Sequence, residues 1–588
     1  MSLAFYCTAL TSSFSLTLRF RSTLHVLRPQ PFKQKDSEQL AVQKKKKKHP
    51  RSMSHQEPES SLVAADMQHQ EKLQTMDAEG QLPAVSATKM AEGLSRATTD
   101  QESLQSFRVI IVGGGPGGLM MAHMLARAGI DWTLLERRDD GGLVQPGTAL
   151  ALWPQAARVL DQLGLLEEAE KLYLPLVGKI NFTKDGTVVC TSNMIERLGT
   201  NHGYPWMLFD RQVLVDFLSR RLPEQETRVQ HGKCVSSIVS TPSEARITCT
   251  DGTVIHGSLI IGCDGVRSGV RRAMRDQATF PEGGSPVPRQ DKKSKPVNDV
   301  DDDVMSAVFT GMAGHCHRPE GMAPQTVHEM HDWGLAILCM AGDDDAYFFV
   351  FKRLPKKNPI SHRPRGDRTS SREEDLAELA AEVADWPVVA GGALRFRDVW
   401  AVRTRATRLD FEEGFAEEWH RGRLVLVSDA AAKMTPNAAF SLATGVQGMV
   451  ELTNRLRRLL LTTSRPSEEQ LTNEVLAPYQ KARQPMAKFV KDFSAGYTRT
   501  SSWSNKGWRF VDWLSPKIGG DAVMTDTMVA SIVKRSIVLD FAEEKDYRVG
   551  KMPWKNGRVK EAPEMLTMGP RKKSIASSDE AVGLASAR

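Results

Sequence analysis

A glycine-rich turn between a β-branched run and an apolar-periodic segment constrains the fold of this chain more than any other feature. The stretch RVIIVGGGPGGLMMAHMLARAGIDWTLLERR predicts a strand, a turn, a helix and a second strand that ends at Glu136. Within it, Gly113, Gly115 and Gly118 form a GxGxxG pattern. The first glycine permits the turn, the second lets a pyrophosphate approach, and the third lets the helix pack on the strand. The segment therefore predicts a βαβ unit with a dinucleotide at a helix N-terminus.

Glu136 narrows the kind of dinucleotide. At the end of the second predicted strand, its carboxylate can accept hydrogen bonds from both hydroxyls of an adenosine ribose, and its charge disfavours a 2′-phosphate. Ala122, Leu125 and Gly129 also fall where this fingerprint requires them. The pattern predicts FAD or NAD rather than NADP, and a glycine-rich turn that binds no ligand is the alternative.

The positive charge of the chain is concentrated at its N-terminal end. The formal net charge of the 588 residues is +7, but residues 1–52 hold eleven Lys or Arg against two acids. The remaining chain is close to neutral, which argues against a nucleic-acid partner. Residues 1–52 are also rich in Ser, Thr and Arg, as is typical of an organelle transit peptide, and a true start at Met53 is the alternative.

Cysteine usage and hydropathy bear on the compartment. Seven cysteines without a CxxC pair favour reduced thiols in an intracellular location, either cytoplasmic or membrane-peripheral. No stretch reaches the roughly 18 uninterrupted apolar residues that a membrane span needs. We therefore expect any membrane contact to be peripheral.

Polar stretches divide the chain into segments. Residues 53–105 lack aromatic side chains, and PEGGSPVPRQDKKSKPVNDVDDD interrupts a run of interleaved strands and helices. The predicted segments are a disordered or targeting tail (1–105), a first part of the dinucleotide-binding domain (106–280, with a substrate-side hairpin near 179–208), an inserted substrate domain (281–400), a second part of the dinucleotide-binding domain (401–495), a C-terminal helical region (496–560) and a disordered tail (561–588).

Two later motifs complete a family resemblance. GCDGVRSGVRRAM (262–274) and VLVSDAAAKMTPN (425–437), together with the glycine turn, resemble the three-motif signature of the group A FAD-dependent monooxygenases, the para-hydroxybenzoate hydroxylase-like family. GTALALWPQAARVLDQLG, GYPWMLFDRQVL and VLDFA resemble the fungal epoxidases and hydroxylases of meroterpenoid and indole-diterpene pathways. The resemblance implies an α/β fold: an FAD-binding GR2-type Rossmann-like domain with an inserted mixed-sheet substrate domain and a helical C-terminal region.

The resemblance also implies a set of site residues. Arg211 matches an arginine that lies along the flavin, Asp264 an aspartate that supports the pyrophosphate, and Asp429 the carboxylate that holds the ribityl chain. The implied cofactor-binding residues are Gly113, Gly115, Gly118, Glu136, Gly147, Arg211, Asp264, Gly265, Asp429 and Leu442. No metal ligands are implied.

The third motif departs from the family pattern. The family usually has glycine where this chain has Ser428 and histidine where it has Ala432. It also follows Pro-Asn with a glycine-rich loop whose backbone amides face the isoalloxazine ring, whereas this chain has Ala439, Phe440 and Ser441. An ordinary side chain at a position that needs a positive φ costs about 1 kcal/mol or more. We expect the chain to bind a flavin, with this loop as the open question for catalysis.

Other side chains have both a functional and a structural interpretation. The phenol of Tyr204 is the candidate catalytic group, an acid or orienting donor near the substrate, and a purely structural role is equally open. Histidines at 315, 317, 328 and 331 are interpreted as polar positions of the substrate domain, because adjacent strand residues face opposite sides. Trp503, Trp508 and Trp513 are expected in core packing or at a membrane surface.

The reaction is inferred from the resemblance. NADPH or NADH reduces the FAD, O2 adds to form a flavin C4a-hydroperoxide, and one oxygen passes to an alkene or electron-rich ring of a small lipophilic secondary-metabolite intermediate. Two alternatives stay open: an FAD oxidase or dehydrogenase, and a non-catalytic scaffold with a degenerate flavin loop.

Overall fold

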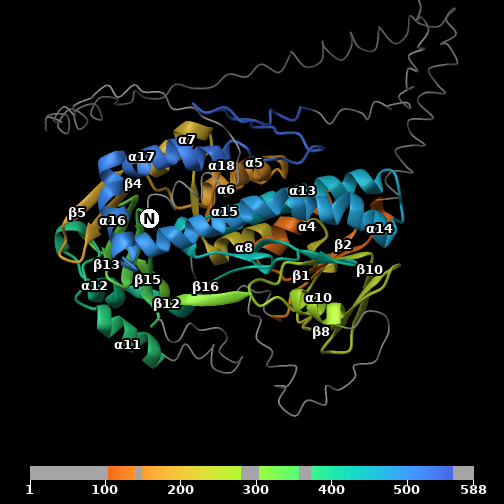
Figure 1. Cartoon of the computed structure of the whole chain (residues 1–588), viewed down its shortest axis with the longest axis horizontal. Helices are drawn as coiled ribbons and strands as arrows, with labels where there is room; N and C mark the ends of the chain where they lie inside the picture. Colours follow the sequence, from red (N-terminus) through yellow and green to blue (C-terminus); the bar gives the residue numbers. More distant parts are fainter. Residues whose placement is uncertain (1–103, 140–148, 280–303, 356–372, 561–588) are drawn as a thin grey trace, which may run out of the picture. The chain divides into compact units, whose positions relative to one another are not determined.

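A six-stranded sheet, ordered β17-β18-β11-β1-β2-β7, is built on the glycine-rich turn (Figure 1). Its strands are β1 (Val109–Val112), β2 (Trp132–Leu135), β7 (Val229–Gln230), β11 (Leu259–Gly262), β17 (His420–Arg421) and β18 (Leu424–Leu426). All pairs are parallel except β17 with β18. Every residue of β1, β2 and β11 is buried, as is usual for parallel strands covered on both faces. The computed structural model describes residues 104–139, 149–279, 304–355 and 373–560.

Helix α4 (Pro116–Ala128) follows β1 directly. Proline at its first position is already set for helical φ, and Gly129 ends the helix in the left-handed conformation. The helix packs against α13 (Ser441–Leu460) and α8 (Arg211–Arg220). In Figure 1 these helices lie above β1, while α10 (Gly269–Thr279) and β8 (Val235–Ser240) lie below it.

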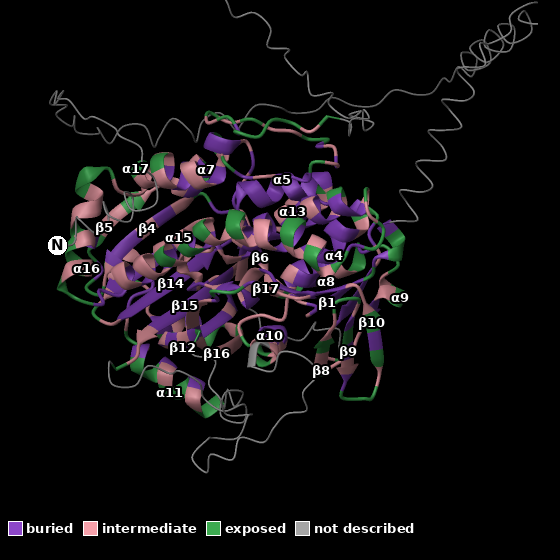
Figure 2. Ribbon diagram, turned by 45° about the vertical axis from the view of Figure 1, so that its right-hand side comes forward, coloured by how far each residue is buried: buried purple, intermediate pink, exposed green. Residues whose placement is uncertain are grey.

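A second, eight-stranded sheet is ordered β19-β16-β12-β15-β14-β13-β4-β5. Its strands are β4 (Gly178–Thr183), β5 (Val188–Ser192), β12 (Met305–His317), β13 (Thr326–Asp332), β14 (Leu335–Ala341), β15 (Asp345–Arg353), β16 (Arg403–Phe415) and β19 (Ala432–Lys433). The central strands are among the most buried parts of the chain (Figure 2). Helices α11 (Glu373–Val383) and α12 (Phe396–Ala401) share a hydrophobic cluster with this sheet.

The predicted boundary at residue 400 cuts through this second sheet. Strand β16 begins at Arg403 and pairs with β12 along most of its length, and its end at Phe415 pairs with β19, so the sheet continues well beyond residue 400. The sequence of β16 does not predict a strand, because nearly all of its residues are only half-buried and apolar and polar residues do not alternate along it. The predicted hairpin joins the same sheet as β4 and β5.

Shorter elements connect the two sheets and complete the C-terminal region. Their helices and turns are α5 (Pro154–Gln162), α6 (Leu166–Leu172), α7 (Met194–His202), α9 (Gln225–Arg228), η2 (Ala390–Gly392), η3 (Ser428–Ala430), η4 (Pro436–Ala438), α14 (Glu468–Gln470), η5 (Leu471–Leu476), α15 (Ala477–Ser501), α16 (Lys506–Leu514), η6 (Ser515–Ile518), α17 (Gly520–Met524), η7 (Thr525–Val529) and α18 (Ala530–Val533). The remaining strands are β3 (Ala149–Leu152), β6 (Met207–Asp210), β8 (Val235–Ser240), β9 (Ala245–Cys249) and β10 (Val254–Gly257). Within the described ranges, no helix combines the length and hydropathy of a membrane span.

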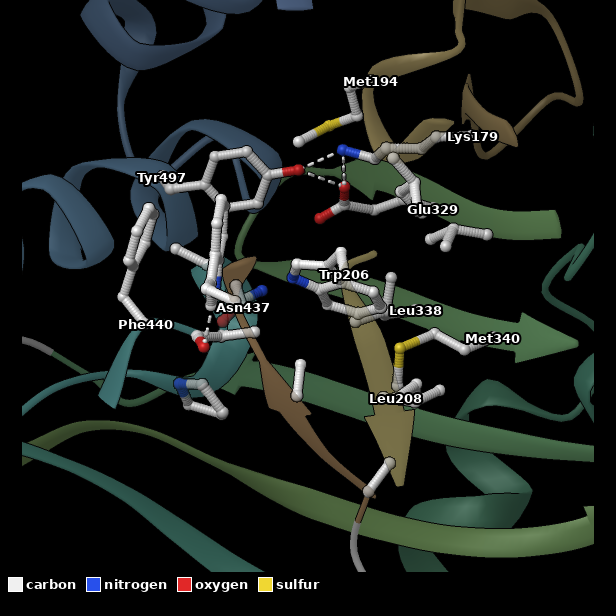
Figure 3. A pocket seen from close by; sticks show the side chains of 18 of the residues that line it. Lys179, Met194, Trp206, Leu208, Glu329, Leu338, Met340, Asn437, Phe440 and Tyr497 are labelled. Carbon is white, nitrogen blue, oxygen red and sulfur yellow. Dashed lines mark hydrogen bonds and ion pairs between the residues drawn. The ribbon is translucent and has the colours of Figure 1, made fainter. Parts of the chain in front are cut away.

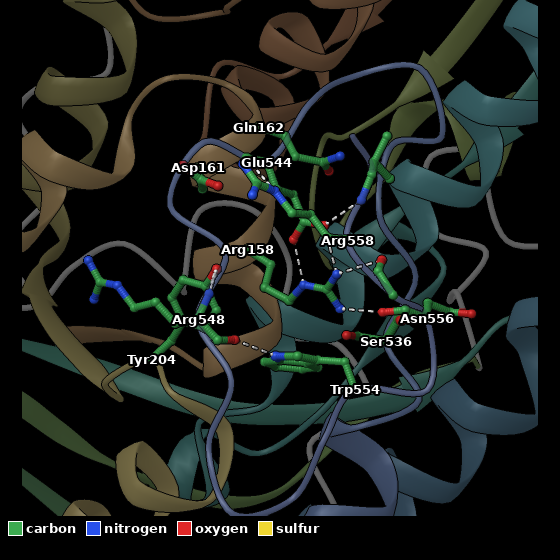
Figure 4. A network of polar contacts seen from close by, with 12 residues as sticks. Arg158, Asp161, Gln162, Tyr204, Ser536, Glu544, Arg548, Trp554, Asn556 and Arg558 are labelled. Atoms are coloured by element: carbon green, nitrogen blue, oxygen red, sulfur yellow. Dashed lines mark hydrogen bonds and ion pairs between the residues drawn. The ribbon is translucent and has the colours of Figure 1, made fainter. Parts of the chain in front are cut away.

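The predicted helical region at 496–560 is helical only as far as Val533. The residues after it run as an irregular segment over α5, and Arg158 on that helix fixes them (Figure 4). The Arg158 guanidinium donates two parallel hydrogen bonds to the Glu544 carboxylate, at 2.7 and 2.8 Å, and both side chains are 0% exposed. Its remaining donors reach the carbonyl oxygens of Asn556 and Gly557 at 3.2 and 3.3 Å. Arg158 therefore binds two distant points of the segment at once.

Replacing Arg158 with Met leaves the buried Glu544 carboxylate without its charged partner, with the amide of Val559 at 3.2 Å still donating to it. We expect Arg158→Met to lower the free energy of unfolding by about 3–5 kcal/mol, because removing one member of a buried pair exposes the full desolvation cost of the other. Denaturant unfolding measures the change. Glu167→Gln, in the exposed pair with Lys171, is the matched control and should change little. Equal losses in the two variants would contradict the role given to the buried pair.

Candidate functional site

Four of the predicted site segments meet at one edge of the six-stranded sheet. The glycine turn follows β1, Glu136 follows β2, Asp264 follows β11, and Asp429 follows β18. Because these strands are parallel, their carboxyl ends lie at the same edge, where α/β sheets bind ligands.

The three motif glycines have separate structural reasons. Gly113 has a φ of +109°, and a Cβ on it would lie 2.7 Å from the carbonyl oxygen of Cys263. A Cβ on Gly118 would lie 1.9 Å from the carbonyl oxygen of Gly113. A Cβ on Gly115 would meet no protein atom within 4 Å. The first and third glycines are thus required by packing, whereas the second faces open space at the N-terminus of α4, where an anion is favoured.

The acidic groups of this edge are held in place by backbone amides. Glu136 accepts hydrogen bonds from the amides of Gly114 (2.7 Å) and Arg138 (3.1 Å). One oxygen of Asp264 accepts from the amides of Gly269 and Val270 at 2.6 and 3.1 Å, at the start of α10. Burial raises the pKa of Asp264 despite these bonds.

Two buried polar atoms at this edge have no partner among the described residues: Asp264 Oδ1 and Arg138 Nη1. Buried polar atoms are nearly always paired, so these atoms indicate a missing polar group. Next to Asp264, Gly265 has a φ of +76° and a Cβ position free of protein atoms. An unpaired guanidinium donor, an unpaired carboxylate oxygen and the open space at Gly115 and Gly265 fit a phosphorylated, hydroxylated cofactor. The predicted Gly147 lies outside the described residues.

Asp429 and Arg211 form the next part of the site. Asp429 accepts hydrogen bonds from Lys433 Nζ at 2.5 Å and from the hydroxyl of Ser441. Although burial opposes ionisation, these groups and the charge of Arg211 together lower the pKa of Asp429. Arg211 is the first residue of α8, which Asp210 caps by accepting from the amides of residues 212 and 213. Leu442 lies in the first turn of α13, whose leading N–H groups have no partner within the helix.

The altered loop adopts left-handed conformations without glycine. Ser428 and Ala439 have φ values of +54° and +55°. The indole of Trp153 donates to the carbonyl oxygen of Ala439 at 2.8 Å, and the Trp153 and Phe440 rings stack with centroids 3.7 Å apart. Gly445 leaves room for Ser428, since a Cβ there would lie 2.6 Å from the Ser428 hydroxyl. Neighbouring residues thus accommodate both departures from the family pattern.

An apolar cavity adjoins this loop (Figure 3). It contains about 880 Å³ that no protein atom fills, part of it open to solvent. Its walls come from the eight-stranded sheet, the β3–β6 pair, α7, the 436–440 loop and the C-terminal helices. The lining side chains include Trp153, Trp206, Leu208, Leu338, Met340, Phe349, Phe351, Phe440, Phe493, Met524 and Val529.

One part of the cavity wall is charged. Lys179 Nζ lies 2.7 Å from Glu329 Oε2, which also accepts from the Tyr497 hydroxyl at 2.7 Å. Burial opposes the charged form of Lys179, but the Glu329 carboxylate outweighs it and raises the pKa of the ammonium. None of these three residues was predicted from the sequence as part of the site. The available signal was HEMH, a polar run within β13, whose interior is buried from Val327 to His331.

Tyr204 lies away from this cavity wall. It is fully buried, its hydroxyl donates to the carbonyl oxygen of Asp546 at 2.7 Å, and the hydroxyl accepts from the amide of Arg548 at 3.1 Å (Figure 4). Burial raises the pKa of the phenol. The Tyr204 hydroxyl is therefore hydrogen-bonded to the C-terminal segment and does not point to the predicted substrate site.

Three of the histidines in the second sheet make hydrogen bonds and ion pairs with neighbouring side chains. His315 contacts Thr404 and Asp345, while His331 Nδ1 lies 3.0 Å from Asp512 Oδ2. In the described part of the chain, no three His, Cys, Asp or Glu side chains gather into a metal-binding group.

Comparison with known proteins decides the family. Residues 106–288 match the FAD binding domain family. The chain is 31% identical over 467 residues to the FAD-dependent monooxygenase srdH of Neurospora crassa. The aligned region covers 76% of this chain and 98% of srdH. It is also 31% identical to the FAD-dependent monooxygenase ausM of Emericella nidulans, over 65% of this chain and 76% of ausM. The chain belongs to the FAD-dependent monooxygenases.

Solved structures agree on the fold of this monooxygenase. Klebsiella pneumoniae HpxO complexed with FAD and uric acid superposes with a TM-score of 0.56 at 18% identity, over 73% of this chain and 97% of HpxO. This likeness confirms the predicted α/β architecture. Family membership makes FAD the cofactor, and a small molecule and O2 the substrates.

The open space at Gly115 provides a test of the FAD site. We expect Gly115→Ala to weaken FAD binding roughly 5- to 150-fold, because an added methyl group would overpack the phosphate site by about 1–3 kcal/mol. Its extended backbone (φ −74°, ψ 179°) tolerates alanine, so the apoprotein should keep its melting temperature. Released flavin, quantified by chromatography, and apoprotein melting are the two measurements.

Gly557→Ala is the matched control for this substitution, because its Cβ also meets no protein atom within 4 Å. It should retain wild-type FAD content. Unchanged FAD affinity in Gly115→Ala would contradict the placement of the pyrophosphate at this turn.

Proposed function

We propose that this monooxygenase uses NADPH or NADH and O2 to hydroxylate or epoxidise a lipophilic intermediate of secondary metabolism. The observation that carries the proposal is the apolar cavity, which adjoins the 436–440 loop on the carboxyl side of β18. An apolar cavity selects an apolar ligand because burial of apolar surface drives binding. The names of the related monooxygenases support the reaction class.

The residues of the sheet edge would hold FAD. The N-terminus of α4 at Gly115 would bind the pyrophosphate, Glu136 the adenosine ribose, and Asp429 the ribityl hydroxyls. Bound FAD, once reduced, supplies the activation of O2. Arg138 Nη1 and Asp264 Oδ1 would find in the cofactor the partners that they lack within the described residues.

The chain itself would position the substrate and exclude water. The stacked rings of Trp153 and Phe440 form a rigid apolar wall beside the 436–440 loop, and both residues are nearly fully buried. Met524 and Val529 close another part of the cavity from the C-terminal helices. A dry cavity protects reactive oxygen species from water and protons, which favours oxygen transfer over wasteful release.

Isotope incorporation distinguishes this function from its alternatives. Purified protein should contain near-equimolar FAD, oxidise NAD(P)H faster with lipophilic alkenes or phenols, and insert one atom of ¹⁸O from ¹⁸O2 into the product. Mass spectrometry of the product and the relative rates with NADPH and NADH are the measurements. An oxidase or dehydrogenase would give product without ¹⁸O, and a non-catalytic scaffold would oxidise no NAD(P)H.

A peripheral membrane contact within the cell fits the C-terminal helices. Among the exposed large apolar side chains are Trp513 (54% exposed) and Ile518 (65%), with Phe510 and Val523 on either side. Lys517 Nζ lies 4.4 Å above the Trp513 ring, an arrangement suited to an anionic lipid surface. The neighbouring Met524 lines the cavity, so the same helices connect this face to the substrate site.

Glutamate substitutions test the contact. We expect the double variant Trp513→Glu and Ile518→Glu to bind anionic phospholipid vesicles at least roughly ten-fold more weakly, since it loses two large apolar side chains from the interface. Vesicle co-sedimentation measures binding. Val239→Glu, at another exposed apolar residue (41%) on β8, is the control and should bind as the wild type does. Equal binding by all three proteins would contradict the contact.

A further inference from the structure

The charged part of the cavity wall is nearly self-contained. Lys179 comes from β4, Glu329 from β13 and Tyr497 from α15, and Lys179 also donates to the Tyr497 hydroxyl (Figure 3). Lys179 is 5% exposed and Glu329 1%, yet all three residues line the cavity. The three residues are called the Lys179 cluster below. Apart from this cluster the cavity is mainly apolar, so the cluster is the place where a ligand can be recognised by polarity.

One atom of the Lys179 cluster has no partner. Glu329 Oε2 contacts both Lys179 and Tyr497, whereas Glu329 Oε1 is buried and accepts no hydrogen bond from any described residue. Figure 3 shows this second oxygen directed away from Lys179, toward the space between Tyr497 and Trp206. An unpaired, buried carboxylate oxygen is costly, typically about 1–3 kcal/mol or more. A ligand that donates a hydrogen bond there would remove that cost.

The charges around Glu329 are balanced, which disfavours an anionic ligand. His331 Nε2 lies 3.6 Å from Glu329 Oε2, while His331 Nδ1 lies 3.0 Å from Asp512. Burial disfavours the imidazolium, but the two carboxylates raise the pKa of His331 to about 9. Two cations, Lys179 and His331, therefore face two anions, Glu329 and Asp512. These four groups leave no surplus positive charge to bind an acid. Within the Lys179 cluster itself the unsatisfied atom is an acceptor, while His331 Nε2 beside it lies 3.6 Å from Glu329 Oε2.

We propose that Glu329 Oε1 accepts a hydrogen bond from a hydroxyl group of an otherwise apolar substrate, with Lys179 and Tyr497 as positioning residues that hold the carboxylate. This inference rests on the proposed function, because it concerns the substrate of the same cavity. The bound hydroxyl fixes one end of the substrate relative to the 436–440 loop. The Lys179 cluster thereby determines which carbon of the substrate faces the flavin side of the cavity.

A matched pair of probes isolates the hydroxyl. Farnesol and farnesyl methyl ether share an apolar chain, but only farnesol can donate a hydrogen bond. Titration calorimetry with the FAD-loaded full chain should give tighter binding of farnesol by roughly ten-fold or more, the usual contribution of a hydrogen bond to a charged group. Glu329→Gln should lose most of that preference while its affinity for the ether is unchanged. Equal affinities of the wild type for the two probes, including no binding of either, would overturn the inference.

Two further variants separate recognition from folding. Glu382→Gln makes the same chemical change on helix α11, where Glu382 forms an exposed ion pair with Lys352 of β15. This variant should keep the full preference for farnesol. The double variant Lys179→Met and Glu329→Gln removes both charges together, which buried pairs tolerate far better than the loss of one partner. It should fold and still show no preference. A double variant that binds farnesol as selectively as the wild type would overturn the inference even if Glu329→Gln fails to fold.

FAD content and NAD(P)H oxidation are measured on the same preparations. A wild-type protein that holds FAD and oxidises NAD(P)H but does not discriminate the probes refutes the hydroxyl site alone. A protein without FAD or NAD(P)H oxidation refutes the proposed function instead. The two failures are therefore distinguishable.

Discussion

The close approach of α4 to β1 is the constraint on which the site depends. Gly118 lies so near the carbonyl oxygen of Gly113 that any side chain would collide with it, and Gly113 itself lies against Cys263 at the end of β11. This packing brings the N-terminus of α4 to the edge where β2, β11 and β18 also end. The helix N-terminus, Glu136, Asp264 and Asp429 can then act on one elongated cofactor because the sheet places them at successive strand ends.

The second sheet imposes a different energetic requirement. Burying Lys179 and Glu329 in an apolar wall is expensive, and well-packed apolar residues at such positions are often as stable or more so. Stability alone therefore does not account for the pair. The unsatisfied Glu329 Oε1, together with the neutral balance provided by His331 and Asp512, gives the pair a use that an apolar pair could not have. A large apolar ligand would bind by burial, and one hydrogen bond would fix its orientation.

The sequence predicted the flavin edge far better than the cavity. The glycine turn and Glu136 follow short apolar strands and were predicted from local pattern, whereas Asp264 and Asp429 were predicted from the family resemblance of the motifs that contain them. Lys179, Glu329 and Tyr497 come together only through the parallel pairing of β4 with β13 and the packing of α15, which no local pattern encodes. Tyr204 shows the converse: a suggestive local motif could not reveal that a segment some 340 residues later occupies its hydroxyl. Strand β16 was not predicted because nearly all of its residues are half-buried, so its sequence shows no alternation of apolar and polar residues.

The altered loop bears on whether the fold has lost its chemistry. Left-handed φ angles at Ser428 and Ala439 cost about 1 kcal/mol or more each, and a loop without constraint would relax out of them. Here each is matched by a specific neighbour: Gly445 leaves room for the Ser428 side chain, and Trp153 binds the Ala439 carbonyl oxygen while stacking on Phe440. These partners come from separate parts of the chain, β3 to α5 on one side and α13 on the other. Specific contacts thus hold these left-handed residues in place without glycine, which favours a working monooxygenase loop over a degenerate one.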